Sequence, residues 1–310
     1  MATGIEWTDA SWNPIVGCTK VSAGCGNCYA IRMAHRLAKN PKIAEVGNDW
    51  VRSGGDGSIR YVSNPYMDST TITNGVVNWS GALSFIPSRL EQPLRWRKPR
   101  RVFVCSMGDL FHESVPFEWV RQVMEVIERC PQHTFQLLTK RPARMLRFYE
   151  SESGFLAGAS AGHGWGWDYP KNAWLGVSVE DQATAGERIP LLLEVPAAVR
   201  FVSVEPLLSA VDVSPWLSAL SQIIVGGESG PGARPMHHSW VRSLRDQCVE
   251  SSTPFFFKQW GEWGSYDLTP DGRGQINPEY RRVGKKAAGR FLDGRTWDEV
   301  PTGEESPDVS

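Results

Sequence analysis

The chain lacks an apolar run long enough to cross a bilayer, and it has no excess of positive charge, with 33 Lys and Arg against 34 Asp and Glu. A membrane-spanning helix needs about 20 consecutive apolar residues, and general attraction of nucleic acid needs a net positive field. The opening residues, MATGIEWTDA, contain no basic segment followed by an apolar one, as a secretory leader would. We therefore expect a cytoplasmic protein with no membrane contact.

Cysteine is also scarce, yet three of the six cysteines, Cys18, Cys25 and Cys28, lie in the short segment GCTKVSAGCGNCYA. A disulfide would leave one of the three without a partner, and a cytosolic setting keeps thiols reduced, so the cluster favours a metal or redox role. Three thiolates can hold an iron–sulfur cluster and leave one iron open for chemistry. Structural zinc is the alternative, with His35 as a fourth ligand.

The other cysteines, Cys105, Cys130 and Cys248, stand singly in apolar segments and are typical of buried structural thiols. They are therefore not expected to take part in a metal site.

The middle of the chain alternates between short apolar runs and stretches with helical spacing. Continuous apolar runs are typical of strands buried on both faces of a parallel sheet. The expected strands are Arg101–Ser106, Thr134–Thr139, Trp174–Ser178, Arg200–Val204, Gln222–Val225 and Pro254–Phe257. The expected helices are Asn27–Lys39, Phe117–Arg129, Pro142–Glu150, Gln182–Glu194, Pro215–Leu220 and Ser239–Glu250. With a strand before the cysteines, this predicts an α/β fold, a complete or partial (β/α) TIM-type barrel of six to seven units.

Each expected strand is followed closely by a charged residue. These residues are Asp109, Lys140, Glu180, Glu205, Glu228 and Lys258. The carboxyl ends of barrel strands gather at one rim, where active sites lie, and the cysteine loop follows the first strand onto the same rim. Surface loops carry charges in any protein, but six consecutive strand ends favour an enzymatic site. Glu205, Glu228 and Lys258 are the candidates for catalytic residues.

A cysteine triad after the first strand of a β/α barrel resembles the radical SAM superfamily. More specifically, the chain resembles a phage- and mobile-element-associated three-cysteine-motif family of unknown function. The resemblance covers most of the chain, through IEWTDASWNPIVGC, VFVCSMGDLF, LLTKRP, GVSVE, VSVEPLL, GGESG, FFFKQWGEW and GRFLDGRTWDEVP. Six residues, not the superfamily's usual three, separate the first two cysteines.

The resemblance implies that Cys18, Cys25 and Cys28 hold a [4Fe-4S] cluster whose open iron binds S-adenosylmethionine. It further implies that an external electron donor reduces the cluster, and that cleavage of the cofactor yields a 5′-deoxyadenosyl radical for modification or repair of a substrate. The residues implied in cofactor binding are Met107, Gly108, Asp109, Lys140, Ser178, Glu180 and Glu205. The alternative is a zinc- or cluster-stabilised module that binds nucleic acid or protein without catalysis.

A basic stretch with an aromatic residue precedes the second strand, and it contains Arg95, Trp96, Arg97, Lys98, Arg100 and Arg101. Cations interleaved with aromatics suit backbone neutralisation and base stacking, so DNA or RNA is a candidate partner; a solvated surface is the plainer interpretation. The stretch would start at the barrel end opposite the expected site.

We expect one radical SAM-like barrel domain over residues 1–300 with two insertions. Residues 40–99 and 151–172 show little periodicity, and insertions of this length are typical of lids or binding loops. Residues 301–310 are expected to form a disordered acidic tail.

Overall fold

The computed structural model describes residues 4–44, 50–53, 59–62, 64–156, 169–264 and 281–301. The chain forms two compact units. The first unit comprises Met1–Val21, Cys28–Trp174 and Val195–Ala197, and the second comprises Ser22–Asn27, Leu175–Glu194 and Ala198–Ser310. Within the described ranges, no helix combines the length and the apolar character that a membrane span requires.

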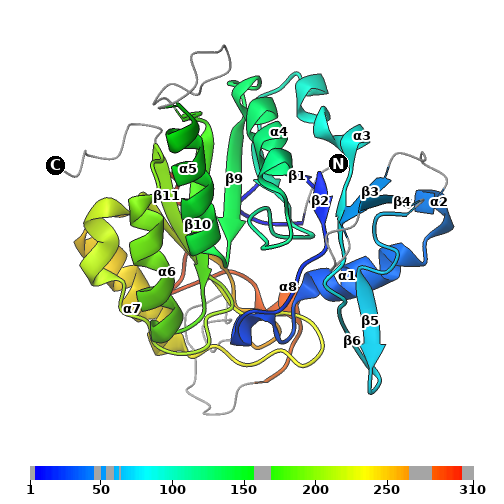
Figure 1. Ribbon diagram of the computed structural model, residues 1–310. Helices are drawn as coiled ribbons and strands as arrows, with labels where there is room; N and C mark the ends of the chain where they lie inside the picture. The colour runs from blue at the N-terminus through cyan, green and yellow to red at the C-terminus, as the bar shows by residue number, and fades with distance from the viewer. Residues whose placement is uncertain are drawn as a thin grey trace. The chain divides into compact units, whose positions relative to one another are not determined.

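The main sheet has seven strands in the order β1-β8-β9-β10-β11-β12-β13. Figure 1 labels four of them, β1, β9, β10 and β11. The strand bounds are β1 Ala10–Trp12, β8 Arg101–Val104, β9 Thr134–Thr139, β10 Ala173–Val179, β11 Val199–Val204, β12 Gln222–Gly226 and β13 Phe255–Gln259. β1, β8 and β9 pair in parallel in the first unit, and β11, β12 and β13 do so in the second. Each of the six apolar runs forms a strand of this sheet, so the prediction of an α/β fold on buried parallel strands is confirmed.

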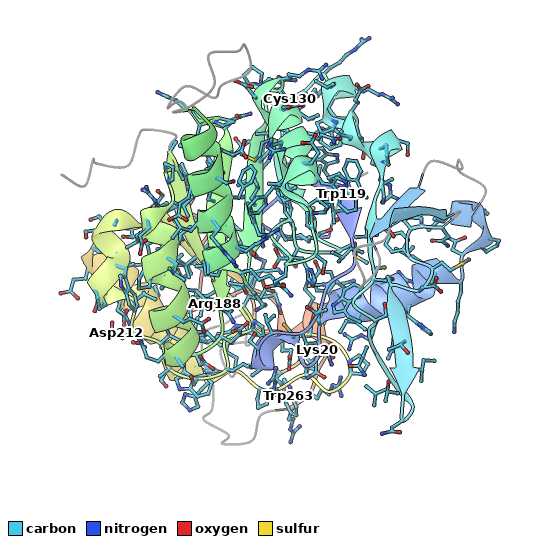
Figure 2. The ribbon with its side chains drawn as sticks, viewed as in Figure 1. Lys20, Trp119, Cys130, Arg188, Asp212 and Trp263 are labelled. Atoms are coloured by element: carbon cyan, nitrogen blue, oxygen red, sulfur yellow. The ribbon has the colours of Figure 1, made fainter. Side chains whose placement is uncertain are left out.

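Two helices of the first unit follow strands of the main sheet. α4 (Phe117–Glu128) links β8 to β9, and α5 (Pro142–Leu156) follows β9. In α4 the buried residues recur at helical spacing, so one side packs inward while the glutamates face water. Trp119, labelled in Figure 2, stacks on Phe85 with ring centroids 5.0 Å apart.

The insertion after α1 (Tyr29–Ala38) contains structure that the sequence analysis did not predict. It contains α2 Pro41–Ala44, β3 Trp50–Ser53, β4 Ile59–Val62, β5 Thr70–Thr73, β6 Val76–Trp79, β7 Leu83–Phe85, α3 Pro87–Leu90 and η2 Pro93–Arg95. With β2 (Ile15–Val16), three of these strands form an antiparallel sheet in the order β2-β7-β3-β4. β5 and β6 form a hairpin whose turn has positive φ at Asn74 and Gly75, as an Asn-Gly turn requires. These strands span two to four residues each, too few to show a period.

In the second unit, helices again follow the strands. α6 (Gln182–Glu194) contacts β11, and α7 (His238–Glu250) contacts β13. The helix expected over Pro215–Leu220 is a 3₁₀ helix, η3 (Ser214–Ala219). Two short helices complete the described elements, η1 (Ala23–Cys25) within the cysteine loop and α8 (Lys285–Ala288) near the C-terminus.

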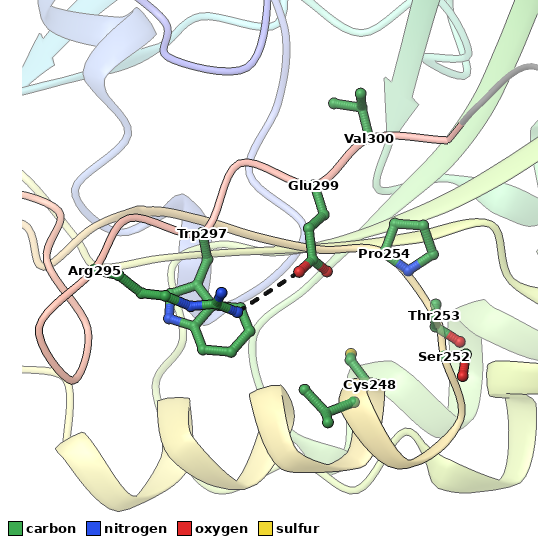
Figure 3. A pocket seen from close by; sticks show the side chains of 9 residues that line it. Cys248, Ser252, Thr253, Pro254, Arg295, Trp297, Glu299 and Val300 are labelled. Atoms are coloured by element: carbon green, nitrogen blue, oxygen red, sulfur yellow. Dashed lines mark ion pairs between the residues drawn. The ribbon is translucent and has the colours of Figure 1, made fainter.

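The last described segment covers the free side of β13. Asp298 bridges Phe256 in antiparallel fashion, and the Phe257 amide donates to the Trp297 carbonyl at 2.9 Å. Beside this segment lies a pocket of about 480 Å³ at the amino end of β13, with Trp297 and Cys248 among its lining residues (Figure 3). Parts of two predictions, residues 157–168 of the second insertion and residues 302–310 of the tail, lie outside the described residues.

Candidate active site around the cysteine loop

Cys18 is positioned by a close approach of two backbones at the carboxyl end of β8. Gly17 and Gly108 form a parallel bridge, and the Gly17 amide donates to the Met107 carbonyl at 3.0 Å. A Cβ atom on Gly108 would lie 2.9 Å from the Gly17 carbonyl oxygen, so only glycine permits this spacing. The turn after β8 includes Cys105 at φ 58°. Met107 and Gly108, predicted to bind cofactor, therefore fix the strand that leads into Cys18.

Asp109 is buried, with 5% of its surface exposed, and both of its carboxylate oxygens are engaged. Oδ1 accepts from the Phe111 amide at 3.0 Å and from Thr139 Oγ1 at 2.8 Å. Oδ2 accepts from Arg141 Nη1 at 2.9 Å and from the Lys140 amide at 3.3 Å. In this arrangement Asp109 joins the end of β8 to the end of β9, which is a positioning role; its part in cofactor binding stays a prediction.

Arg141 connects Asp109 to the first cysteine. Its Nη1 lies 3.6 Å from Cys18 Sγ, and its Nη2 donates to the Thr19 carbonyl at 3.1 Å and to Thr19 Oγ1 at 2.8 Å. Its Nε donates to Glu113 Oε2 at 2.7 Å. The guanidinium is thus a buried cation whose donors converge on the Cys18–Thr19 segment.

The sequence analysis missed Arg141 because it singled out the neighbouring Lys140. Arg141 lies in the turn just beyond β9, where its amide donates to Thr139 Oγ1 at 2.9 Å. The alternation of side chains in the strand does not extend past this turn, so no local pattern distinguishes Arg141 from Lys140.

The charges of Asp109 and Arg141 have opposite effects on the pKa of Cys18. Burial and the Asp109 charge raise the pKa of the Cys18 thiol and Arg141 acts to lower it, with a net rise to about 12. Cys28 also acts to raise this pKa. A metal centre that binds Cys18 as thiolate would remove the proton that burial now favours.

His112 completes the polar network on the far side of Thr19. Its Nδ1 accepts from the Ser114 amide at 3.1 Å, so its Nε2 carries the proton and donates to Thr19 Oγ1 at 2.8 Å. Burial and the Arg141 charge lower the pKa of His112, which favours the neutral imidazole.

In the second unit, Glu180 holds the loop segment that contains Cys25. The side chain is fully buried, and its Oε1 accepts from Ser22 Oγ at 2.9 Å. Because that hydroxyl has one proton, the 3.8 Å contact between Ser22 Oγ and Cys25 Sγ is made with the thiol as donor. Arg188 of α6, labelled in Figure 2, pairs with Glu180 Oε2 at 3.2 Å. A Cβ atom on Gly24 would lie 2.4 Å from Glu180 Cγ, so the loop is packed directly on this carboxylate.

Glu228 holds the other end of the same segment. Its Oε2 accepts from Asn27 Nδ2 at 3.0 Å, and Arg234 donates to both of its oxygens, at 3.0 and 2.7 Å. Arg234 Nη2 also donates to the Ala23 carbonyl at 2.9 Å. Burial opposes ionisation, but the hydrogen bonds from Arg234 and Asn27 hold the pKa of Glu228 below its ordinary value. Two strand-end carboxylates, Glu180 and Glu228, thus hold residues 22–27.

Glu205 and Lys258 form a separate pair at the carboxyl ends of β11 and β13. Lys258 Nζ lies 2.6 Å from Glu205 Oε1, and both groups are largely shielded from water. Ser178 Oγ donates to the Glu205 carbonyl at 3.0 Å, which ties the end of β10 to the same place. Gly226, opposite Glu205, leaves room for this carboxylate, since a Cβ there would lie 3.2 Å from Glu205 Cδ. Three predicted site residues are therefore neighbours.

The basic stretch lies at the other end of its strand. Arg101 is the first residue of β8 and contacts Asp9, and Arg100 lies over the Trp96 ring at 5.4 Å. Trp96 also packs against His133 with ring centroids 5.8 Å apart, so the ring is a partly buried packing residue. Within the first unit, this stretch marks the amino end of β8, whereas Cys18 and Asp109 lie beyond its carboxyl end.

The cysteine sulfurs are suitable donors for an iron–sulfur cluster. Thiolates are the ligands that such clusters take, and Arg141 supplies a cationic N–H group toward one sulfur. In the described ranges, no group of three or more His, Cys, Asp or Glu side chains is arranged around a possible metal position. Cys28 packs against a hydrophobic cluster of the first unit that includes Met107, whereas Cys25 belongs to the second unit. The residue types are thus those that an iron–sulfur cluster takes, and the iron–sulfur cluster itself stays a prediction.

Residues 2–301 match the profile of a family described as "Protein of unknown function (DUF5131)". The chain belongs to the DUF5131 family. Comparison with curated proteins and with solved structures gave no match. The match covers both compact units, so the Cys18–Asp109–Arg141 network and the Glu180 and Glu228 contacts all fall within the DUF5131 region.

Proposed function

We propose that this DUF5131 protein is a radical SAM-type [4Fe-4S] enzyme that reductively cleaves S-adenosylmethionine to modify or repair a substrate, a nucleic acid. One observation supports this most directly: in each unit, buried charged residues at the carboxyl ends of the sheet strands hold part of the cysteine loop. In the first unit Arg141 contacts Cys18, and in the second Glu180 and Glu228 hold residues 22–27. Ligand sites of parallel α/β sheets lie at this end of the strands.

Cys18, Cys25 and Cys28 would hold the cluster. When bound, the cluster and S-adenosylmethionine supply one-electron cleavage of the sulfonium carbon–sulfur bond, with electrons from an external donor. We propose that the seven-stranded sheet is the wall of a partial (β/α) barrel and that Lys140, Ser178 and Glu205 line its cofactor side. Glu205 and Lys258 would orient the substrate as a preformed ion pair.

The roles of the remaining strand-end residues are to position the loop. Glu180 and Glu228 use their oxygens on Ser22, Asn27 and two arginines, so they fix the loop before any ligand binds. Such prior ordering reduces the entropy that cofactor binding would otherwise cost. Asp109 does the same for Arg141.

The test is reconstitution with iron and sulfide without oxygen. We expect a brown protein with roughly four irons, and we expect Cys18→Ala, Cys25→Ala and Cys28→Ala each to abolish iron binding. Cys248→Ala is the matched control, because this buried thiol on α7 lies in a different part of the second unit. Full iron in all three loop variants would refute the ligand assignment, and iron-loaded protein that does not convert S-adenosylmethionine to 5′-deoxyadenosine and methionine would refute the activity.

A module stabilised by zinc or a cluster, without catalysis, is the second candidate. The observation that favours it is the engagement of Asp109, Glu180 and Glu228 by groups of the protein itself, since structural sites are typically enclosed by such contacts. Colourless protein that retains zinc and shows no cofactor cleavage would support this candidate.

A further inference from the structure

Charge is distributed unevenly along this nearly neutral chain. Between Asp9 and Glu45 the sequence contains no Asp or Glu, while it contains Lys20, Arg32, Arg36, Lys39 and Lys42. This acid-free segment includes all three loop cysteines and α1. This segment therefore has a net positive charge, although the net charge of the chain is −1.

Most of these cations lie on one side of α1. At 3.6 residues per turn, Tyr29, Arg32, Arg36 and Lys39 fall within about 80° of the helix circumference. The buried residues of this helix, Ala30, Ile31 and Ala34, lie on the opposite side. We call Tyr29, Arg32, Arg36 and Lys39 the α1 stripe.

The two cations in the carboxyl-terminal half of the α1 stripe are accessible. Arg36 and Lys39 are exposed, and no carboxylate in the described part of the chain forms an ion pair with either. Arg36 Nη2 lies 2.8 Å from the sulfur of Met33, within its own helix. Tyr29 is 44% exposed, and its hydroxyl donates to the Ser106 carbonyl at 2.8 Å, which holds the ring in place.

The position of the stripe relates it to the proposed site. Tyr29 follows Cys28 directly, and Ser106 lies just beyond the carboxyl end of β8, where Cys18 and Asp109 also lie. The stretch from Arg95 to Arg101, in contrast, lies at the amino end of β8. Of these two basic segments, the α1 stripe is the one that starts next to a loop cysteine, Cys28.

We propose that the α1 stripe binds the sugar–phosphate backbone of a single-stranded nucleic acid and that Tyr29 stacks on one of its bases. The eleven residues from Tyr29 to Lys39 are separated by ten steps of 1.5 Å and so extend about 15 Å, the axial length of roughly four nucleotides at 3.4 Å each. An anionic membrane is a poorer fit, because the apolar side of α1 is buried in the protein and cannot enter lipid. The proposal names a substrate class for the proposed enzyme and rests on that function only for the chemistry that follows binding.

The test measures binding of a fluorescein-labelled oligothymidylate of twenty residues to the full chain, with and without reconstituted iron, over a range of salt. We expect Arg36→Gln with Lys39→Gln to reduce the slope of log K against log salt by about 1.4, since each phosphate contact on a single strand contributes about 0.7. Tyr29→Ala should weaken binding by about five- to hundredfold, while Tyr29→Phe keeps the ring and most of the affinity.

The matched control is Arg97→Gln with Lys98→Gln, which removes the same charge from two exposed residues of the other basic stretch. This control should leave the slope unchanged. A slope that falls in the control and not in the stripe variant, or binding to phosphatidylserine vesicles without binding to the oligonucleotide, would overturn the proposal. An iron-loaded protein that cleaves S-adenosylmethionine but does not bind the oligonucleotide would overturn this inference alone. Iron-free protein that binds through the stripe would support it even if the proposed enzymatic activity failed.

Discussion

Arg141 Nη1 lies between Asp109 and Cys18, 2.9 Å from the carboxylate oxygen Oδ2 and 3.6 Å from the sulfur. The carboxylate orients the guanidinium, and the guanidinium directs a positive charge toward the thiol. Hydrogen bonds to cysteine sulfur help to set the potential of iron–sulfur clusters. Arg141, which directly precedes α5, thus connects the ends of two strands with Cys18 in one buried network. Through this contact it would affect the proposed redox chemistry.

The first prediction concerns the stability of this network. Arg141→Gln should lower the free energy of unfolding by about 3–5 kcal/mol, because it leaves the buried Asp109 charge without its partner. Adding Asp109→Asn to that variant should recover part of the loss. Arg144→Gln is the control: it removes an arginine from α5 that lies over the Phe117 ring and does not contact Cys18. Equal losses in the Arg141 and Arg144 variants, measured by urea unfolding, would contradict the special role of Arg141.

The second prediction concerns reduction of the reconstituted cluster. A donor to sulfur stabilises the reduced form, which has more negative charge, so Arg141→Gln should lower the reduction potential. A tenfold change in the ratio of reduced to oxidised cluster corresponds to 59 mV for a one-electron couple. Redox titration followed by electron paramagnetic resonance would measure the shift. Arg141→Lys, which keeps the charge, should lie between wild type and Arg141→Gln; an unchanged potential in both variants would exclude a contact with the cluster.

The third prediction uses two glycines of the second unit. Gly24→Ala places a methyl group 2.4 Å from Glu180 Cγ, so it should displace the loop, cost about 1–3 kcal/mol and reduce iron content after reconstitution. Gly186→Ala is the control, because this exposed position in α6 has no atom within 4 Å of the added Cβ. It should stabilise the protein by about 0.5–1 kcal/mol through helix propensity. If Gly24→Ala binds iron fully and unfolds like wild type, the loop does not depend on this contact.

The sequence predicts the sheet better than it predicts the contacts around the cysteines. β9 and α6 have the expected bounds because long apolar runs and helical spacing depend on local composition. The partners Ser22, Asn27 and Arg234 were not foreseen, since contacts across about 160 to 210 residues depend on tertiary packing and leave no local pattern. Arg188 was not predicted for another reason. In the sequence, a buried arginine in a helix cannot be distinguished from an exposed one until the position of its partner Glu180 is known.

The fourth prediction concerns the Glu205–Lys258 pair. Each of Glu205→Gln and Lys258→Met should destabilise the protein, and the double variant should be less destabilised than the sum of the two, with a coupling of about 0.5–3 kcal/mol. Arg295 and Glu299 provide the comparison, because their side chains are 59% and 47% exposed and 3.8 Å apart (Figure 3). An exposed pair of this kind contributes about 0–1 kcal/mol. Equal coupling energies in the double-mutant cycles of the two pairs would mean that Glu205 and Lys258 are solvated in solution.

The last prediction follows from the depressed pKa of Glu228. Its carboxylate accepts hydrogen bonds from Arg234 and Asn27, so its pKa in the folded protein lies below the ordinary value of 4.5. A carboxylate of this kind stabilises the fold fully above the unfolded pKa and loses that contribution as the pH falls through the folded pKa. Glu228→Gln should therefore cost about 1.5–3 kcal/mol at neutral pH, and the difference from wild type should shrink below about pH 4.5.

Urea unfolding of the wild type and the Glu228→Gln variant from pH 7 to pH 3 would measure this difference. Glu250→Gln, at an exposed position on α7, is the control and should change stability by less than about 0.5 kcal/mol throughout. Because Glu228 holds Asn27 next to Cys28, the variant should also retain less iron after reconstitution than the control does. A Glu228→Gln protein with a constant deficit at every pH would show that the carboxylate acts through its shape and not through its charge.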